Sequence, residues 1–516
     1  VVGGTTALTS VTTDAAGTVV INGGAITTSG AQTYNEAITL GAATTLSASS
    51  ITTGSTITGG GNAITLTTDA LALGGNISST GALLIQAKTA STTIGIGSDA
   101  SGTLSLSDAE IGYLSNGFSS ITFGNSSGTG NIAINFATVP TFADNLAIRS
   151  SSGTITATDA LNTSTNTLTI NSSGAAVSVA GITSGTLSIT GTGITLNGNV
   201  TTTGSQIYSG AVTLGDAITL TSNNSDVTFN GTGSTINGAK DFTVNAGSGA
   251  ITFGGVVGVN SVLASLSLTT THATGITLNG NITTTGAQAY NGNVVLAANT
   301  TLATTNSDVS FGGTLKGDGV ATRTLSITAG TGAVSFTGAV GTSYALGATA
   351  ITAATTTNSS TWIGNSTLGI TGNAVVNGAI SGITTLNISG TTSLGANVTS
   401  SSTQTYTGAV TITGSTVTAT TTNSAVMFAS TVNSAATAAK PLTVSAGSGN
   451  VTCTGVVGGA TDGALGALTV NSTATTTFSA AVTAASVTTD ASGTTAINGG
   501  AVTTSGAQTY NDAVTL

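Results

Sequence analysis

Apolar and polar residues alternate along the chain in short runs that are separated by glycine-containing turns. In DFTVNAGSGAITF, which starts at Asp241, the apolar residues Phe242 and Val244 and then Ile251 and Phe253 alternate with polar or small residues. A period of two is the pattern of a β-strand with one buried face. The pattern therefore predicts an all-β chain of short strands joined by tight turns.

These strand patterns recur in longer repeats. SVTTDAAGTVVINGGAITTSGAQTYNEAITL at residues 10–40 returns with conservative changes at residues 486–516, an offset of 476. GITLNGNVTTTGSQIYSGAVTL from Gly193 returns as GITLNGNITTTGAQAYNGNVVL from Gly275, an offset of 82. Internal repeats of this kind indicate solenoids or repeat arrays.

A Gln-x-Tyr element stands before an alternating strand in each of these modules. We interpret it as a structural mark of register, in which each tyrosine stacks on its own type along the repeat or covers a turn. A row of tyrosines that binds glycans is the alternative, because aromatic rings suit sugars. The element occurs at Gln32/Tyr34, Gln206/Tyr208, Gln288/Tyr290, Gln404/Tyr406 and Gln508/Tyr510.

Alignment of the modules also predicts which side chains face the core. Val309 and Phe311 should point inward and Ser310 outward, because neighbours along a strand alternate in direction. Cys453 takes the place of a phenylalanine in sister modules, so we expect a small core residue rather than a nucleophile. The predicted core residues are Phe229, Phe253, Phe311, Phe336, Phe428 and Cys453.

Asn-Gly pairs between alternating strands, as at Asn279-Gly280, are also the main signal of antiparallel hairpins, so a meander is the alternative fold. Repetition favours a solenoid, because a short unit buries too little alone whereas stacked coils share a continuous core. We predict a parallel β-solenoid built from irregular repeats, with coils of about 20–25 residues spaced about 4.8 Å apart.

We expect residues 1–516 to form a single continuous solenoid. Around Ser107, the letters Ser-Asp-Ala-Glu resemble a helix start and predict a protruding short helix or loop near residues 107–114. The expected segments are 1–40 (partial module), 41–192 (divergent coils), 193–274 (module), 275–391 (module with insertion), 392–485 (module) and 486–516 (partial module repeating 10–40).

Composition excludes several classes of protein. Only 4% of residues are charged, but 39% are hydrophobic and just two are proline, which argues against a disordered linker. The net charge of −10, with few and scattered basic residues, disfavours nucleic acid and anionic membrane surfaces as partners. No run of about 18 apolar residues is present, so we expect no membrane insertion of this segment.

Residues that could carry chemistry are isolated. The two glutamates, Glu36 and Glu110, are far apart in sequence, and a glycosidase, the enzyme alternative, needs a carboxylate pair. Asp226 and Asp308 repeat at one module position, as turn residues do. His272 has no histidine or cysteine companion for a metal, and we expect it in a solvated turn. The sequence predicts no catalytic residue, no cofactor and no metal site.

Two segments resemble the giant filamentous-haemagglutinin-like adhesins of Gram-negative bacteria. They are TTTGAQAYNGNVVL, from Thr283, and LSDAEIGYLSNGFSSITFG, from Leu106. The resemblance implies a right-handed parallel β-helix that is exported unfolded through an outer-membrane pore and folds outside the cell. The N-terminal secretion domain of that family is not in the sequence, and we expect the chain to be an excerpt or a processed piece.

These observations together predict the structural stalk or fibre of an extracellular bacterial adhesin or surface appendage. Its partners would be the surface of a host or neighbouring cell, or copies of itself, and a polysaccharide is a further candidate. A filament or sheath subunit that polymerises through its solenoid ends is the main alternative. An ice- or polysaccharide-binding array is a lesser alternative. The Thr-Thr pairs of this chain shift in register between modules and so do not form the flat lattice that such an array needs.

Overall fold

The computed structural model describes residues 1–231, 233–435, 438–461 and 463–516. Almost all of its regular structure is β-strand, about 1% is helix, and the sheets are parallel and stacked as a β-solenoid of about 24 turns. The predicted all-β, parallel β-solenoid fold is therefore confirmed. The chain forms two compact units, unit 1 at Val1–Ser261 and unit 2 at Val262–Leu516.

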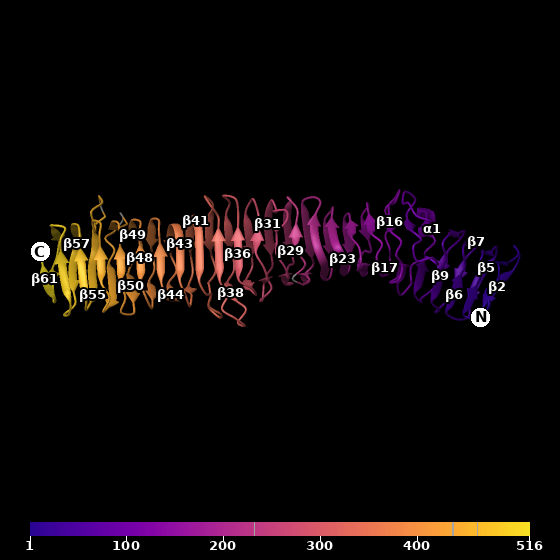
Figure 1. The fold of residues 1–516 in the computed structure, drawn as a ribbon, viewed down its shortest axis with the longest axis horizontal. Coiled ribbons are helices and arrows are strands. Elements are labelled where there is room, and N and C mark those ends of the chain that lie inside the picture. Colours follow the sequence, from indigo (N-terminus) through magenta and orange to yellow (C-terminus); the bar gives the residue numbers. More distant parts are fainter. Residues whose placement is uncertain (232, 436–437, 462) are drawn as a thin grey trace. The chain divides into compact units, whose positions relative to one another are not determined.

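In unit 1, strands of successive coils pair in parallel sheets and lie side by side (Figure 1), and two four-stranded sheets end at Leu71–Leu73 and Ile77–Ser78. One of these sheets continues through most of the unit. Its strands are β3 (Ala25–Thr27), β6 (Thr44–Ser47), β9 (Ile64–Thr67), β12 (Leu83–Gln86), β15 (Ile121–Gly124), β17 (Leu146–Ser150), β20 (Leu168–Ser172), β23 (Leu187–Leu196), β25 (Gln206–Leu214), β27 (Val227–Phe229) and β30 (Ile251–Phe253).

Unit 2 also has parallel sheets. One contains β31 (Ser265–Thr269), β34 (Gln288–Asn291), β37 (Val309–Phe311), β40 (Ala333–Phe336), β41 (Thr349–Asn358), β43 (Leu368–Val376), β46 (Thr392–Leu394), β49 (Val410–Ile412) and β52 (Val432–Ser434). A second contains β33 (Ile282–Thr283), β36 (Thr300–Ala303), β39 (Leu325–Thr328), β45 (Leu386–Ile388), β48 (Gln404–Tyr406), β51 (Val426–Phe428), β54 (Val451–Cys453), β56 (Thr475–Phe478) and β58 (Thr494–Ile497), with β41 and β43 spanning both sheets.

Alternation of side chains along each strand builds the core. Val309 and Phe311 are almost fully buried, whereas Ser310 between them is only partly buried. In β51, Met427 is 40% exposed although Val426 and Phe428 on either side are fully buried. The inward position of one coil lies against the inward position of the next, so apolar side chains form continuous stacks along the unit.

Parallel pairing rules out the antiparallel meander for the strands of the described residues. The number of residues between paired positions of successive coils differs along the chain: it is 18 from Ala374 to Thr392, 21 from Gln288 to Val309 and 25 from Val309 to Val334. Coil length thus varies more than the predicted 20–25 residues. Because the modules do not contain a fixed number of equal coils, the Gln-x-Tyr elements in β34 and β48 lie on different sheets of unit 2.

Asparagines at the turns link successive coils. Asn306 adopts a left-handed conformation (φ 56°), and its Oδ1 accepts a hydrogen bond from the backbone N–H of Thr331 in the next coil at 3.1 Å. Gly330 stands directly against it, also with positive φ, and a Cβ there would lie 2.3 Å from Asn306 Oδ1. The recurring Ala-Gly-Ser/Thr-Gly turn therefore requires glycine at this position, both for its backbone angle and for its lack of a side chain.

A segment inserted into unit 1 carries the single described helix. Strand β12 pairs with both β9 and β15, and the chain between β12 and β15 forms β13 (Ile94–Ile96), β14 (Leu104–Leu106) and helix α1 (Asp108–Gly112). Ser107 and Glu110 form a capping box at the start of α1, within the region 107–114 where a helix or loop was predicted. The Glu110 carboxylate also accepts from the backbone N–H of Leu73, which ties α1 to the neighbouring coil.

Candidate functional site

The Gln-x-Tyr element forms a buried polar corner, which we describe in its unit 2 copy. Gln288 and Tyr290 are fully buried, and the Tyr290 hydroxyl donates to Gln288 Oε1 at 2.9 Å. Gln288 Nε2 donates to the Thr284 hydroxyl at 3.3 Å and to two backbone carbonyls, one in its own coil and one in the next. Burial raises the pKa of Tyr290 well above its usual value, so the phenol stays neutral. The corner is a closed hydrogen-bond network.

The same corner occurs in the other complete copies. Each has a buried glutamine that accepts from a buried tyrosine hydroxyl and donates to a hydroxyl four residues earlier. These triads are Thr28/Gln32/Tyr34, Thr202/Gln206/Tyr208 and Ser400/Gln404/Tyr406. In the fifth copy, Tyr510 also donates to Gln508, at 3.2 Å, but both side chains are at least partly exposed. The buried corner thus forms in four copies of the motif, and the fifth copy keeps the hydrogen bond between tyrosine and glutamine.

In three copies of the motif, the tyrosine ring stacks on a phenylalanine ring of the next coil rather than on another tyrosine. The centroid distances are 5.0 Å for Tyr208 on Phe229, 5.0 Å for Tyr290 on Phe311 and 5.1 Å for Tyr406 on Phe428. In each case the residue of the next coil that pairs with the tyrosine is a phenylalanine, so the tyrosine ring stacks on a phenylalanine ring. Because Tyr34, Tyr208, Tyr290 and Tyr406 are fully buried, their rings are closed to a glycan.

The other aromatic side chains singled out from the sequence extend these stacks. Phe253 lies edge-on to Phe229 at 5.3 Å, and Phe336 stacks on Phe311 at 5.1 Å. Cys453 lies between Phe428 and Phe478 in the ladder of the second unit 2 sheet and is 5% exposed. Burial raises the pKa of its thiol to about 12, which leaves it protonated and unreactive.

We expect Cys453 of the folded chain to resist alkylation by iodoacetamide at pH 8. The attacking species is the thiolate, and a thiol with a pKa of about 12 supplies almost none of it at that pH. In denaturant the thiol should be modified within minutes. The measurement is the mass increase of the intact chain over time, with a denatured sample as the control. Rapid modification of the folded chain would contradict the buried position.

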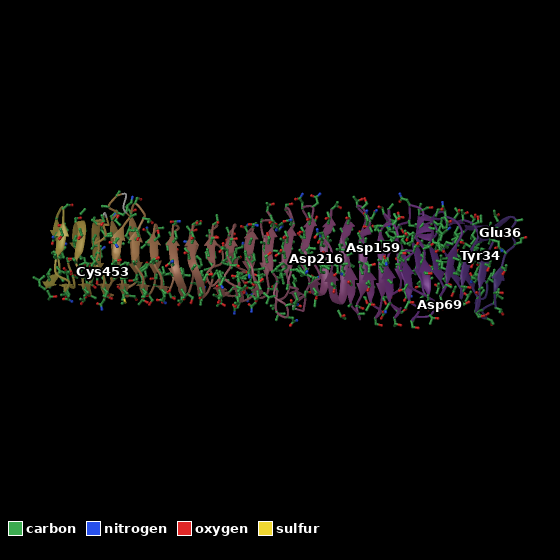
Figure 2. All side chains as sticks on the ribbon, turned by 90° about the horizontal axis from the view of Figure 1, so that it is seen from above. Tyr34, Glu36, Asp69, Asp159, Asp216 and Cys453 are labelled. Atoms are coloured by element: carbon green, nitrogen blue, oxygen red, sulfur yellow. The ribbon has the colours of Figure 1, made fainter. Side chains whose placement is uncertain are left out.

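Acidic side chains are dispersed and serve mostly as acceptors for backbone N–H groups. Asp226 accepts from Ala250 at 2.8 Å, and Asp308 accepts from Ala333 at 2.7 Å, each in the following coil. Figure 2 shows Glu36, Asp69, Asp159 and Asp216 at separate places in unit 1. These four carboxylates are not paired with one another.

Asp69 has the densest set of partners of these carboxylates. Its oxygens accept from the backbone and hydroxyl of Thr89, from the Thr92 hydroxyl and from the backbone of Lys88. Burial acts to raise the pKa of Asp69, but these hydrogen bonds together outweigh it and lower the pKa. The side chain organises the turn that follows β12, so its partners explain it without a ligand.

Basic side chains and the histidine are likewise held separately. Lys88 donates to the Thr28 carbonyl at 2.8 Å, and the Arg323 guanidinium pairs with Asp318, whose pKa it lowers to about 2. His272 is partly exposed in a turn, where its Nδ1 accepts from the Thr274 backbone. Within residues 1–231, 233–435, 438–461 and 463–516, no three His, Cys, Asp or Glu side chains gather as metal ligands.

A hollow beside α1 is a feature that the sequence did not indicate. It has a volume of about 240 Å³, and its lining includes Ile111, Leu114 and Phe142 together with Asp108 and Asp144. Asp144 was not singled out because, in the sequence, it resembles the scattered turn aspartates. The adjacent Pro140, one of two prolines in the chain, was the available signal of an unusual loop.

No helix of the described residues is long and apolar enough to cross a membrane.

Comparison with known proteins identified no relative of the chain. No protein-family model matches the sequence, and no curated protein or solved structure is significantly similar to it.

Proposed function

We propose that the chain is a non-catalytic structural stalk or fibre of an extracellular bacterial adhesin or surface appendage. The observation that carries this proposal is the stacking of coils within each unit, in which the strands of one coil pair in parallel with those of the next. Such ladders resist local unfolding, because most backbone N–H groups are bonded to a neighbouring coil. A stalk outside the cell needs this property.

Two further features support the proposal. The polar residues that repeat most regularly, Gln288 and Tyr290 and their counterparts, are used inside the core. The chain contains six Lys and Arg residues in 516, so trypsin-like proteases meet few cleavage sites. We propose the surface of a host or neighbouring cell, or further copies of the chain, as the partner; a polysaccharide would meet the Ser- and Thr-rich surface rather than the buried tyrosines.

Negative-stain electron microscopy and limited trypsin digestion of the purified chain test this function. We expect elongated single particles and a chain that stays intact under digestion conditions that degrade a denatured sample. Compact globular particles or rapid cleavage of the folded chain would contradict a stalk. Filaments that lengthen with concentration would instead favour the self-assembling subunit, and thermal hysteresis would favour the ice-binding array.

A further inference from the structure

The core of unit 2 contains a cluster of buried polar atoms that lack hydrogen-bond partners. Thr356 and Asn358 lie two residues apart on the inward face of β41, and Thr392 lies on the inward face of β46. All three residues are at most 4% exposed. Among the described residues, nothing is hydrogen-bonded to Thr356 Oγ1, Asn358 Oδ1 or Thr392 Oγ1. Because an unpartnered buried polar atom is costly, the cluster indicates a partner that is not a protein group.

Strand pairing brings these residues together in the stacks of the core. Thr356 pairs with Ala374 of the next coil, and Ala374 pairs with Thr392 of the coil after that. Successive coils are about 4.8 Å apart, so the two threonines flank the Ala374 methyl group from either side. The same stack has Val334 before Thr356 and Val410 after Thr392. Alanine at the middle position therefore leaves room that a valine side chain would fill.

The fixed orientation of the Asn358 amide restricts what can bind. Its Nδ2 donates to the Gly378 carbonyl at 3.0 Å, so its oxygen faces the other way and can only accept. The hydroxyls of Thr356 and Thr392 can each donate or accept. The partner must therefore donate to the amide oxygen, accept from a hydroxyl and fit beside one methyl group.

Water meets these conditions, because it both donates and accepts and makes two to four hydrogen bonds when buried in a protein. An ion is a poor alternative. None of the three side chains of the cluster is charged, so an ion would lose its hydration without an opposite charge to compensate.

We propose that the core of unit 2 binds water beside Ala374, with one molecule between Thr356 and Asn358 and a second, bonded to the first, on Thr392. The first molecule donates to Asn358 Oδ1 and accepts from the Thr356 hydroxyl. The site does not depend on the proposed stalk function, because it is formed entirely by interior side chains of neighbouring coils.

A high-resolution crystal structure of the full chain tests the site directly. We expect electron density for a water molecule within about 3.2 Å of both Thr356 Oγ1 and Asn358 Oδ1, and for another within the same distance of Thr392 Oγ1. Hydroxyls that are turned to backbone carbonyls, with no such density beside Ala374, would overturn the proposal. Density with the ligand distances of a metal ion would overturn the choice of ligand.

Thr356→Val separates a hydrated cluster from a dry one, because valine has nearly the shape of threonine but no hydroxyl. If water bridges Thr356 and Asn358, the variant loses a hydrogen bond in the core, and we expect the unfolding equilibrium constant to rise at least about fivefold. If the hydroxyl is dry, its replacement removes an unpartnered polar atom and the constant should fall. A fall or no change in denaturant unfolding of the full chain would overturn the proposal.

Thr357→Val is the matched control, since it makes the same change one position away on the outer face of β41. Its effect on the unfolding equilibrium constant should stay within about twofold. An effect as large as that of Thr356→Val would mean that the loss of the interior hydroxyl is not the cause, which would overturn this support for the site.

Ala374→Val distinguishes bound water from a hydroxyl that is bonded to the backbone. Its added methyl groups take the place that we assign to water, so the variant should lose long-lived internal water. Oxygen-17 relaxation dispersion of the full chain counts such water, and we expect a lower count in Ala374→Val and no change in Thr357→Val. An unchanged count in folded Ala374→Val would overturn the proposal. If this variant misfolds, the crystal structure of the unmodified chain is decisive.

Discussion

Replacing Phe311 with aspartate is expected to lower the free energy of unfolding of the surrounding coils by about 5 kcal/mol. Phe311 is 1% exposed and is stacked between Tyr290 and Phe336 at 5.0 and 5.1 Å. The substitution removes both ring contacts and places a carboxylate in an apolar interior. Because each coil contacts only its neighbours, hydrogen exchange should accelerate first in β34, β37 and β40, and later in remote coils of unit 2.

Ser310→Asp is the matched control, since it adds the same carboxylate one position away on the outer face of β37. Its effect on the free energy of unfolding should stay within about 0.5 kcal/mol. The two variants are compared by hydrogen exchange and denaturant unfolding of the full chain. Equal effects of the two substitutions would mean that the strand register is wrong.

Replacing Gln288 with methionine is expected to cost about 3 kcal/mol, because the Tyr290 hydroxyl is left without its acceptor in a fully buried position. Methionine keeps a similar side-chain length, so the loss of hydrogen bonds dominates over the loss of packing. Tyr290→Phe removes the donor to Gln288 Oε1 but leaves all the hydrogen bonds that Gln288 Nε2 donates, so it should cost less, about 1 kcal/mol.

The double variant Gln288→Met/Tyr290→Phe separates a buried network from independent contacts. Once both polar partners are gone, no tyrosine hydroxyl remains to be satisfied, and the double variant should be more stable than the sum of the single effects by at least about 1 kcal/mol. Denaturant unfolding of the four chains gives the coupling energy. Strictly additive effects would show that the hydrogen bond between the two side chains does not stabilise the core.

The periodic features of the fold were predictable from the sequence. Alternation identifies inward and outward positions without a structure, as Val426, Met427 and Phe428 show, because a strand has only two faces. Repetition decided between a hairpin meander and a parallel solenoid. Both inferences depend on local patterns that many coils repeat, so an error in predicting one strand has little effect on the predicted fold.

Features that depend on contacts between coils were harder to predict from the sequence. The sequence marked Gln288 and Tyr290 as a recurring pair, but one of the carbonyls that Gln288 reaches, that of Ala303, lies in the next coil. The hydroxyl four residues before each glutamine, such as Thr284, was a readable signal of the buried corner. The hollow beside α1 had no such signal, since Asp144 meets Gly117 only after the inserted segment folds back.

Several turn asparagines and aspartates accept hydrogen bonds from the coil that follows them in the sequence, which bears on how the chain folds. Asn306 and Asp308 belong to one coil, and the amides they accept, those of Thr331 and Ala333, belong to the next. A coil that has already formed therefore presents its acceptors to residues that follow it in the sequence. If the N-terminus folds first, each folded coil is a template for the coil that follows it in the sequence. Folding can then proceed from the N-terminus to the C-terminus, and the folding of each coil pulls on the chain that is still unfolded.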